Sequence, residues 1–241
     1  MAFETSGIAE GTVPTDYLAP AAFPQAIPIT VTPALVKAER TMADRPNYSD
    51  AYLANLALCR QIAEIGPRHG RFVAHMAVIE YDGLAYAFAA PSGTGKSTHI
   101  RLWKDVFGPR VKVINGDKPI LRLSGSVMDK PVVIACGTPW GGKEGWQSNA
   151  SAPLAGLCFV RRGDVDACRL LDPGEALTRA LGQVYMPTDP QSAALTLDFL
   201  DVLLREVPLF DLSCTMGRSA VKASFEAMTG HNLETSAEEA K

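Results

Sequence analysis

The chain has 241 residues, of which 47% are hydrophobic and 20% charged, and its formal net charge is −3. This length and composition fit one large globular domain, with or without an N-terminal extension, and supply enough apolar residues for a core. The nearly balanced charge gives no electrostatic sign of a nucleic-acid or anionic-membrane partner. No apolar run is long enough to span a membrane and the first residues lack a signal-peptide pattern, so a cytoplasmic protein is expected. Five cysteines without C-x-x-C spacing favour buried, reduced thiols over a metal or redox site.

Residues 1–70 are expected to form an N-terminal extension with one helix. Residues 1–28 are rich in Ala, Pro, Thr and Gly without sustained periodicity, which favours loose order or extended packing on the surface. Residues 27–31 predict a short edge strand, because prolines exclude a central one. Apolar residues at spacings of three and four predict the helix over about 50–65.

The main domain is expected over residues 71–230, followed by a flexible acidic tail at 231–241. Phe72–Ile79 predicts a strand, and Asp82-Gly83 predicts a hairpin turn into the next strand. A second hairpin is expected from a strand at 121–123 through a Ser-Gly-Ser turn. Because hairpins are antiparallel, the pattern predicts a mixed α/β sheet. Further strands are expected at 111–114, 132–136, 154–160 and 209–214, and helices after residue 97, at about 174–184, at 190–206 and up to Met228.

The stretch Ala89–Thr98 reads A-A-P-S-G-T-G-K-S-T between an apolar strand and an amphipathic helix. This is the context of a phosphate-binding loop, in which glycines let backbone N–H groups turn toward an oxyanion. Lys96 would supply positive charge to the β- and γ-phosphates, and the Ser97 hydroxyl would bind Mg²⁺. Ala90 stands where the usual pattern has its first glycine, a mild change at a strand end. The nucleotide-binding residues predicted here are Ser92, Gly93, Thr94, Gly95, Lys96, Ser97 and Thr98, with ATP as the expected nucleotide.

Asp117 ends a second apolar strand, V-K-V-I-N-G-D, about one helix and one strand after Lys96. That strand is expected to lie beside the strand of the phosphate-binding loop, which would bring the carboxylate to the phosphates. A carboxylate there holds Mg²⁺ or accepts the proton of an attacking hydroxyl. The alternative is a polar turn residue, a role in which Asn-Gly-Asp is common.

The run from His75 to Pro119 contains H-x-x-x-I-E-Y-D-G, P-S-G-T-G-K-S-T-H and V-I-N-G-D-K-P. It resembles the HPr kinase/phosphorylase and phosphoenolpyruvate-carboxykinase-like superfamily, most of all its small HPr-kinase-related members such as the lasso-peptide serine kinases. The likeness covers about Phe72 to Met228. It implies a mixed, curved sheet around a P-loop, unlike the all-parallel sheet of P-loop NTPases, and a role for His75 near the transferred phosphate. From the residues alone, His75 would more simply be a hydrogen-bonded core histidine.

The family's strand-end motif usually carries two adjacent acidic residues, where this chain has Gly116-Asp117. Asp117 matches the second of the pair, which favours metal coordination over proton abstraction. One carboxylate must then serve both roles, or one role is missing.

Other candidates lie outside these motifs. Lys143, in the glycine-rich loop 137–145, would approach the phosphates and neutralise developing charge, and its alternative is a solvated Lys-Glu pair. Trp140 in the same loop suggests a substrate or lid contact. His99 is expected to lie on the helix surface. Three further basic residues, Lys118, Arg161 and Arg162, are candidates for phosphate or acidic-substrate contacts, and solvated positions are their alternative.

The function expected is an ATP- and Mg²⁺-dependent kinase that phosphorylates a hydroxyl, most simply serine, on a peptide or small protein. A small-molecule kinase and a non-catalytic nucleotide-binding regulatory module are the alternatives. Full HPr kinases have a longer N-terminal region, so HPr itself is a doubtful acceptor. The acceptor, the phosphate donor and homo-oligomer formation are left open by the sequence.

Overall fold

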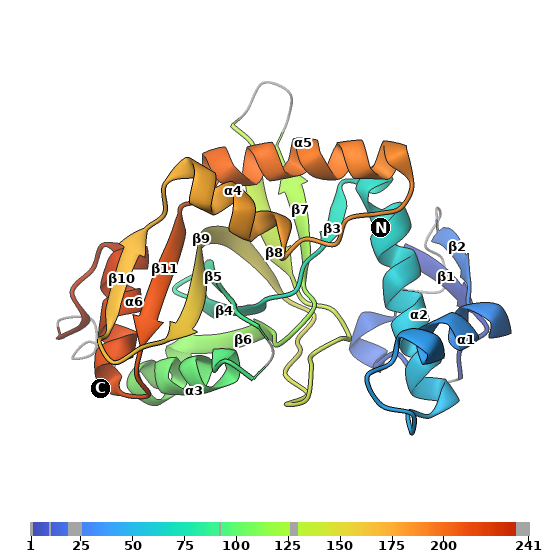
Figure 1. The fold of residues 1–241 in the computed structure, drawn as a ribbon, viewed down its shortest axis with the longest axis horizontal. Coiled ribbons are helices and arrows are strands. Elements are labelled where there is room, and N and C mark those ends of the chain that lie inside the picture. The colour runs from blue at the N-terminus through green and yellow to red at the C-terminus, as the bar shows by residue number, and fades with distance from the viewer. Residues whose placement is uncertain (1, 10, 19–25, 92, 126–129, 235–241) are drawn as a thin grey trace.

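The computed structural model describes residues 2–9, 11–18, 26–91, 93–125 and 130–234. The strands of its central sheet are β3 (Arg71–Val73), β4 (Ala77–Tyr81), β5 (Leu84–Ala89), β6 (Val111–Asn115), β7 (Ile120–Ser124), β8 (Val132–Cys136), β9 (Ser151–Arg162), β10 (Ala167–Leu170) and β11 (Leu209–Cys214). Their order is β3-β7-β8-β9-β5-β4-β6, and β11 and then β10 continue the sheet from the second half of β9 (Figure 1). β5 and β11 run parallel to β9, and the other paired strands are antiparallel. The expected mixed α/β class is therefore confirmed.

Helices cover both faces of this sheet, because its strands send apolar side chains alternately to each face. They are α3 (Lys96–Phe107), α4 (Pro173–Leu181), α5 (Pro190–Glu206) and α6 (Arg218–Thr229), with the short 3-10 turn η3 (Gly108–Arg110) after α3. β5 shows the alternation, since Ala85 and Ala87 belong to the core under α4 and α5, whereas Tyr86 and Phe88 belong to the core under α3 and α6 (Figure 1).

The N-terminal residues form a smaller unit beside the β3 end of the sheet (Figure 1). Its elements are β1 (Ala2–Ser6), η1 (Thr15–Tyr17), β2 (Ala26–Thr30), α1 (Pro33–Met42), α2 (Asp50–Ile65) and η2 (Gly66–His69). β1 and β2 form a two-stranded parallel sheet, and α2 coincides with the helix expected over about 50–65. The helix α1, which precedes α2, was not predicted. Thr32 and Pro33 are start signals for it, and in the structure the Thr32 hydroxyl accepts the Leu35 N–H at 3.4 Å. A third cluster joins α2 to Val73 and Trp140 of the main sheet region.

The strand predicted at 72–79 is in fact two strands. β3 pairs with β7, whereas β4 pairs with β5 and β6, and the residues between them leave the sheet. In this break, the N–H groups of Ala74, His75 and Met76 bond to the carbonyls of Pro119, Gln183 and Asp117. Alternation could not reveal the break because the residues on both sides of it are apolar and buried.

A second correction concerns the strand before Asp117. β6 and β5 were expected to be neighbours. Instead, β6 pairs with β4, and β4 lies between β6 and β5. The hairpin β4–β5 is confirmed, with Asp82 and Gly83 both at positive φ (50° and 79°) in the turn. The hairpin partner of β7 is β8, while residues 126–129 of its turn lie outside the described residues.

All five cysteines are free thiols. Among the described helices, none has the length and apolarity to cross a membrane.

Candidate functional site

A glycine-rich loop, residues 90–95, joins the end of β5 to the start of α3. Gly93 and Gly95 both have positive φ, 78° and 129°, a conformation that side chains with a Cβ rarely adopt. A Cβ added at either glycine would meet no atom within 4 Å, so the space beside the loop is open. Ser92 lies outside the described residues. Backbone freedom, open space and a helix N-terminus together form a seat suited to an anion.

Two cationic side chains, those of Lys96 and Arg162, donate hydrogen bonds to backbone carbonyls of the loop. The Lys96 Nζ donates to the Ala90 carbonyl at 2.9 Å, and Arg162 at the end of β9 donates to the carbonyls of Gly93 (2.8 Å) and Thr94 (3.3 Å). Burial lowers the pKa of Lys96, and the negative charge of Asp117 opposes that shift. Arg162 therefore braces the loop backbone, whereas from the sequence the Arg161-Arg162 pair was recognisable only as the basic end of a strand.

Asp117 lies in the turn that follows β6, and hydrogen bonds from buried polar residues hold this turn in place. The side-chain oxygen of Asn115, which is fully buried, accepts the Asp117 N–H at 2.9 Å, as in an Asx turn. The Asn115 amide donates to the carbonyl and hydroxyl of Thr138 (3.0 Å each), and the Thr138 hydroxyl donates to the Lys118 carbonyl at 2.6 Å. Sequence reasoning missed both bracing residues, although the Asn-Gly-Asp tripeptide carried the signal for the turn.

His75, Asp117 and Lys118 form one charged group. His75 Nε2 lies 3.2 Å from one Asp117 carboxylate oxygen, and Lys118 Nζ lies 2.5 Å from the other. Burial alone would raise the pKa of Asp117, but the His75 hydrogen bond and the Lys118 charge outweigh it and lower the pKa to about 2. Asp117 is therefore ionised at neutral pH and is a weak base.

The space around Gly116 leaves no room for a second acidic side chain at the strand end. A Cβ at Gly116 would lie 2.5 Å from the Gly141 carbonyl oxygen and 3.2 Å from that of Trp146. No acidic side chain fits there without moving the loop between β8 and β9. Asp117 is thus the carboxylate that this turn can offer.

The loop 137–150 contacts α2 on one side through Trp140 and α3 on the other through Trp146. Trp140 is 8% exposed, and its indole N–H donates to Asn55 of α2 at 3.0 Å, so the ring packs against the N-terminal unit. Trp146 lies under the Arg101 guanidinium, with 5.2 Å from the guanidinium carbon to the ring centroid. Lys143 is exposed, next to Gly142, whose added Cβ would lie 3.0 Å from the Asp117 Cβ.

His99 is buried, not on the surface as expected. It is 2% exposed, its Nε2 lies 2.9 Å from the Ser224 hydroxyl, and Trp103 Nε1 donates toward the same nitrogen at 3.2 Å. Burial lowers the pKa of His99 to about 4, so the ring is neutral at pH 7. Arg161 is likewise structural, since it pairs with the buried Asp211 at 3.0 Å.

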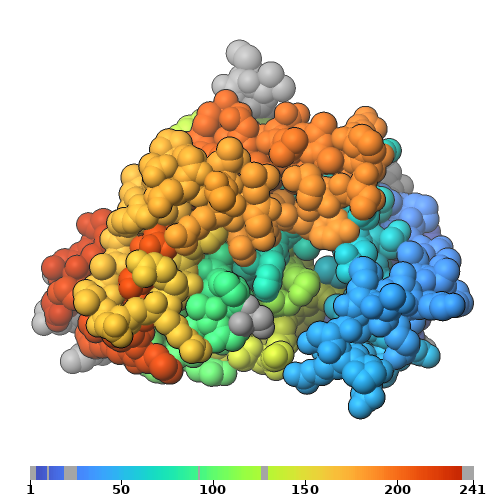
Figure 2. Space-filling view, viewed as in Figure 1, coloured from blue at the N-terminus to red at the C-terminus, as the bar shows by residue number. Residues whose placement is uncertain are grey.

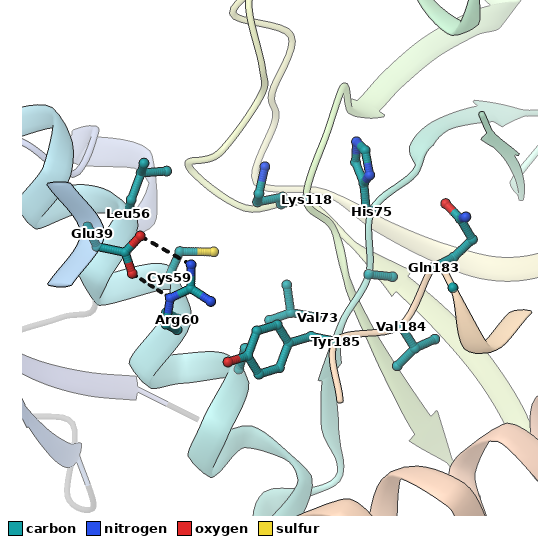
Figure 3. A pocket seen from close by; sticks show the side chains of 13 residues that line it. Glu39, Leu56, Cys59, Arg60, Val73, His75, Lys118, Gln183, Val184 and Tyr185 are labelled. Carbon is teal, nitrogen blue, oxygen red and sulfur yellow. Dashed lines mark hydrogen bonds and ion pairs between the residues drawn. The ribbon is translucent and has the colours of Figure 1, made fainter. Parts of the chain in front are cut away.

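One pocket borders His75 and Lys118, and a second borders the glycine-rich loop. The first, here called the α2 pocket, has a volume of about 300 Å³ and lies between α2, the His75 break and the segment after α4 (Figure 3). The second, the β11 pocket, has a volume of about 260 Å³ and lies between the loop, the first turns of α3 and the ends of β9 and β11. The hollow between the N-terminal helices and the rest of the molecule is visible in Figure 2.

The arrangement brings together Lys96, Asp117 and Lys118, whose charges act on one another, and His75 completes the group. Ser97 and Thr98 start α3 beside it. Within the described residues, no cluster of three or more His, Cys, Asp or Glu side chains forms a preformed metal cage.

No family model and no curated protein matches this chain. Among solved structures, it is similar to an HPr(Ser) kinase/phosphatase from Coxiella burnetii, with 7% identity over 62% of this chain and 89% of that one, and a TM-score of 0.32. A likeness at this TM-score does not assign a family, so the family expected from the sequence stays a prediction and the site geometry carries the functional argument.

Proposed function

We propose that this chain is a P-loop kinase, related to the HPr kinases, that transfers the γ-phosphate of ATP to a hydroxyl of a peptide or small protein, with serine as the expected residue. The observation that carries the proposal is the group of His75, Lys96 and Lys118 around the single carboxylate of Asp117, beside an open glycine-rich loop. Together they provide a phosphate seat, positive charge and a proton acceptor in one place.

In this proposal the phosphates lie over the loop, with the γ-phosphate toward Asp117 and the nucleoside toward the β11 pocket on the other side. Ser97 and Asp117 would hold Mg²⁺ with phosphate oxygens, since Mg²⁺ takes oxygen ligands, and the ion would neutralise charge between the β- and γ-phosphates. Lys96 and the exposed Lys143 would add positive charge around the transferred group.

The acceptor oxygen attacks the γ-phosphorus, the bond from that phosphorus to the bridging oxygen breaks, and ADP leaves with the bonding electrons. The hydroxyl proton passes to the Asp117 carboxylate late in the step, as its low pKa requires. His75 orients that carboxylate through its 3.2 Å contact.

The test is transfer of label from γ-labelled ATP with Mg²⁺ to a serine-peptide pool and, separately, to a metabolite pool. Wild type is compared with Lys96→Ala and with a control, Lys112→Ala, whose side chain is 69% exposed. We expect labelled peptide from wild type and the control, and a loss of about a hundredfold or more in Lys96→Ala. Label in a metabolite would identify a small-molecule kinase, and ATP binding without transfer to either pool would favour a regulatory module.

A further inference from the structure

The α2 pocket opens onto the charged group of the site. His75 and Lys118 line its upper end in Figure 3, and both contact Asp117. On the opposite wall, Arg60 of α2 forms a two-bonded ion pair with Glu39 of α1. A group that enters this pocket therefore reaches His75 and Lys118 at the end where the phosphoryl group would be transferred.

The charges that line the pocket are already balanced. The Arg60 guanidinium is paired with Glu39, whose side chain is 6% exposed, and the Lys118 ammonium is paired with Asp117. Burial raises the pKa of the Cys59 thiol to about 12, so that wall is neutral. Because each of these cations is paired with a carboxylate, these pairs give the pocket wall no excess charge, and the pocket suits an uncharged group better than a charged metabolite.

Apolar side chains make up much of the remaining lining. They come from α2, from β3 and from the segment after α4, so three separate parts of the chain meet here. The apolar lining residues are Leu56, Ala63, Val73, Ala74 and Val184, and the Tyr185 ring lies below Val73 in Figure 3. Contact with an aliphatic side chain would bury apolar surface on both partners, which stabilises a complex by about 25 cal/mol per Å².

The apolar surface continues beyond the pocket along α2. Tyr52 is one turn before Leu56 on the same helix face, is 45% exposed, and stacks on Tyr48 with ring centroids 4.6 Å apart. A ligand that used this surface as well as the pocket would have to be longer than a single small metabolite. The extent of the surface therefore favours a chain molecule.

Gln183 has a side-chain hydrogen-bond acceptor without a partner among the described residues. This side-chain oxygen is buried, and the residue lines the pocket. An unpaired buried acceptor costs about 1–3 kcal/mol, which a donor from a ligand would recover. A peptide backbone N–H is such a donor.

From these observations we infer that the α2 pocket is the acceptor site, and that it binds a peptide segment in which the serine or threonine is flanked by an apolar residue. The inference rests on the proposed kinase function. The flanking side chain fills the apolar wall, a peptide N–H pairs with Gln183, and the hydroxyl lies at His75 and Asp117. There its oxygen bonds to the γ-phosphorus, its proton passes to Asp117, and ADP departs with the electrons of the broken bond.

The test uses the full chain with capped peptides Gly-Leu-Ser-Leu-Gly, Gly-Asp-Ser-Asp-Gly and Gly-Lys-Ser-Lys-Gly, and with free L-serine. Binding is followed by the methyl NMR signals of Leu56, Val73 and Val184, and transfer by labelled ATP. We expect the leucine peptide alone to shift these methyl signals, and its kcat/KM to exceed those of the charged peptides at least tenfold.

Leu56→Asp is the main variant, because it places a charge on the apolar wall. We expect it to raise the KM for the leucine peptide about tenfold or more while leaving kcat and the Mg–ATP dissociation constant unchanged. The control is Leu197→Asp on α5, where the leucine is 51% exposed and does not line the pocket. Gln183→Met keeps the size of the side chain and removes its acceptor, and it should weaken binding several-fold even if Leu56→Asp does not fold.

Equal use of free serine, preference for a charged peptide, or unchanged KM in both pocket variants would overturn the acceptor-site assignment. Those results leave Mg–ATP binding intact, so they differ from a failure of the kinase proposal. That failure would appear as absent Mg–ATP binding, while the methyl signals would still report whether the leucine peptide enters the pocket.

Discussion

The regions around His75 and His99 place the same side chain in opposite settings. His75 lies in the break between β3 and β4 with 44% of its side chain exposed, and it contacts the ionised Asp117. His99 lies in the first turn of α3 at 2% exposure, and its hydrogen bonds go to Ser224 and Trp103. One histidine thus belongs to a group of charges at a pocket, and the other to the core between α3 and α6.

The sequence indicated different environments for the two histidines, but it did not predict that His99 is buried. The resemblance to the HPr kinase family implied a role for His75, whereas a histidine at the start of a phosphate-binding helix was expected on the surface. The difference follows from the partner that each ring meets: the His75 ring contacts the Asp117 carboxylate, whereas the core around His99 disfavours the charged form of that ring. Variants that separate catalysis from stability can therefore test the contrast.

The largest effect is expected from Asp117→Asn. The amide keeps the shape of the side chain but removes the charge that faces His75 and Lys118, and with it the proposed proton acceptor and metal ligand. We expect the rate of phosphoryl transfer to fall by about a hundred- to a thousandfold. Initial rates with labelled ATP and an acceptor peptide would measure this.

The control for that variant is Asp201→Asn on α5, where the aspartate is 66% exposed. Asp117 also contributes stability: its pKa of about 2 is below the ordinary 3.8, so up to about 2 kcal/mol is present above pH 4 and is lost as the pH falls through 2. Near-UV circular dichroism at pH 7.5 must therefore show that Asp117→Asn is folded. A folded variant with near wild-type transfer would remove Asp117 from the mechanism.

The second effect is a pH dependence of stability that His99 produces. Its pKa falls from 6.5 to about 4 on folding, so below pH 6.5 the unfolded chain takes up a proton that the folded chain does not. The free energy of unfolding should therefore decrease from pH 7.5 to pH 4.5 by roughly 2–3 kcal/mol on account of this residue. Urea unfolding of wild type and His99→Gln at both pH values would show a smaller decrease in the variant. Parallel decreases in the two proteins would contradict the neutral, buried His99.

Much of the fold was predictable because local patterns determine it. The β4–β5 turn, α3, β11 and the helix at 50–65 each carry strong signals of their own, such as Asp-Gly at positive φ or apolar spacing of three and four. The break between β3 and β4 carries no such signal. It exists because the N–H groups of residues 74–76 find carbonyl partners in distant segments, a tertiary effect that no window of sequence contains.

The candidate site was predictable to the level of its motifs and no further. Lys96 and Asp117 lie close enough for their charges to interact, although β4 separates their strands. The bracing by Asn115 and Thr138, and the exclusion of a second acidic residue at Gly116, depend on the loop 137–150 packing against the turn. Packing between segments far apart in the chain is what the sequence could not supply.

The third effect tests the other histidine. His75→Gln keeps a hydrogen-bond donor but replaces the ring that orients Asp117, and we expect phosphoryl transfer to fall about ten- to thirtyfold with the Mg–ATP dissociation constant unchanged. The same substitution at His69, an exposed residue of η2, is the control. Steady-state rates and nucleotide titrations would measure both quantities. An unchanged rate would make His75 a structural residue like His99 and would abolish the contrast.

The smallest effect concerns the contact between the loop 137–150 and α2. Trp140→Phe removes the indole N–H that donates to Asn55 and keeps an aromatic ring, so it should lower the free energy of unfolding by about 1 kcal/mol. Trp146→Phe is the control in the same loop, since it retains a ring beneath Arg101. Urea unfolding gives the stability, and labelled ATP gives the transfer rate. If the role of Trp140 is to join the loop to α2, the phosphoryl-transfer rate of Trp140→Phe with saturating peptide should stay near that of wild type. A tenfold loss of rate at unchanged stability would instead return Trp140 to the substrate contact that its place in a glycine-rich loop suggested.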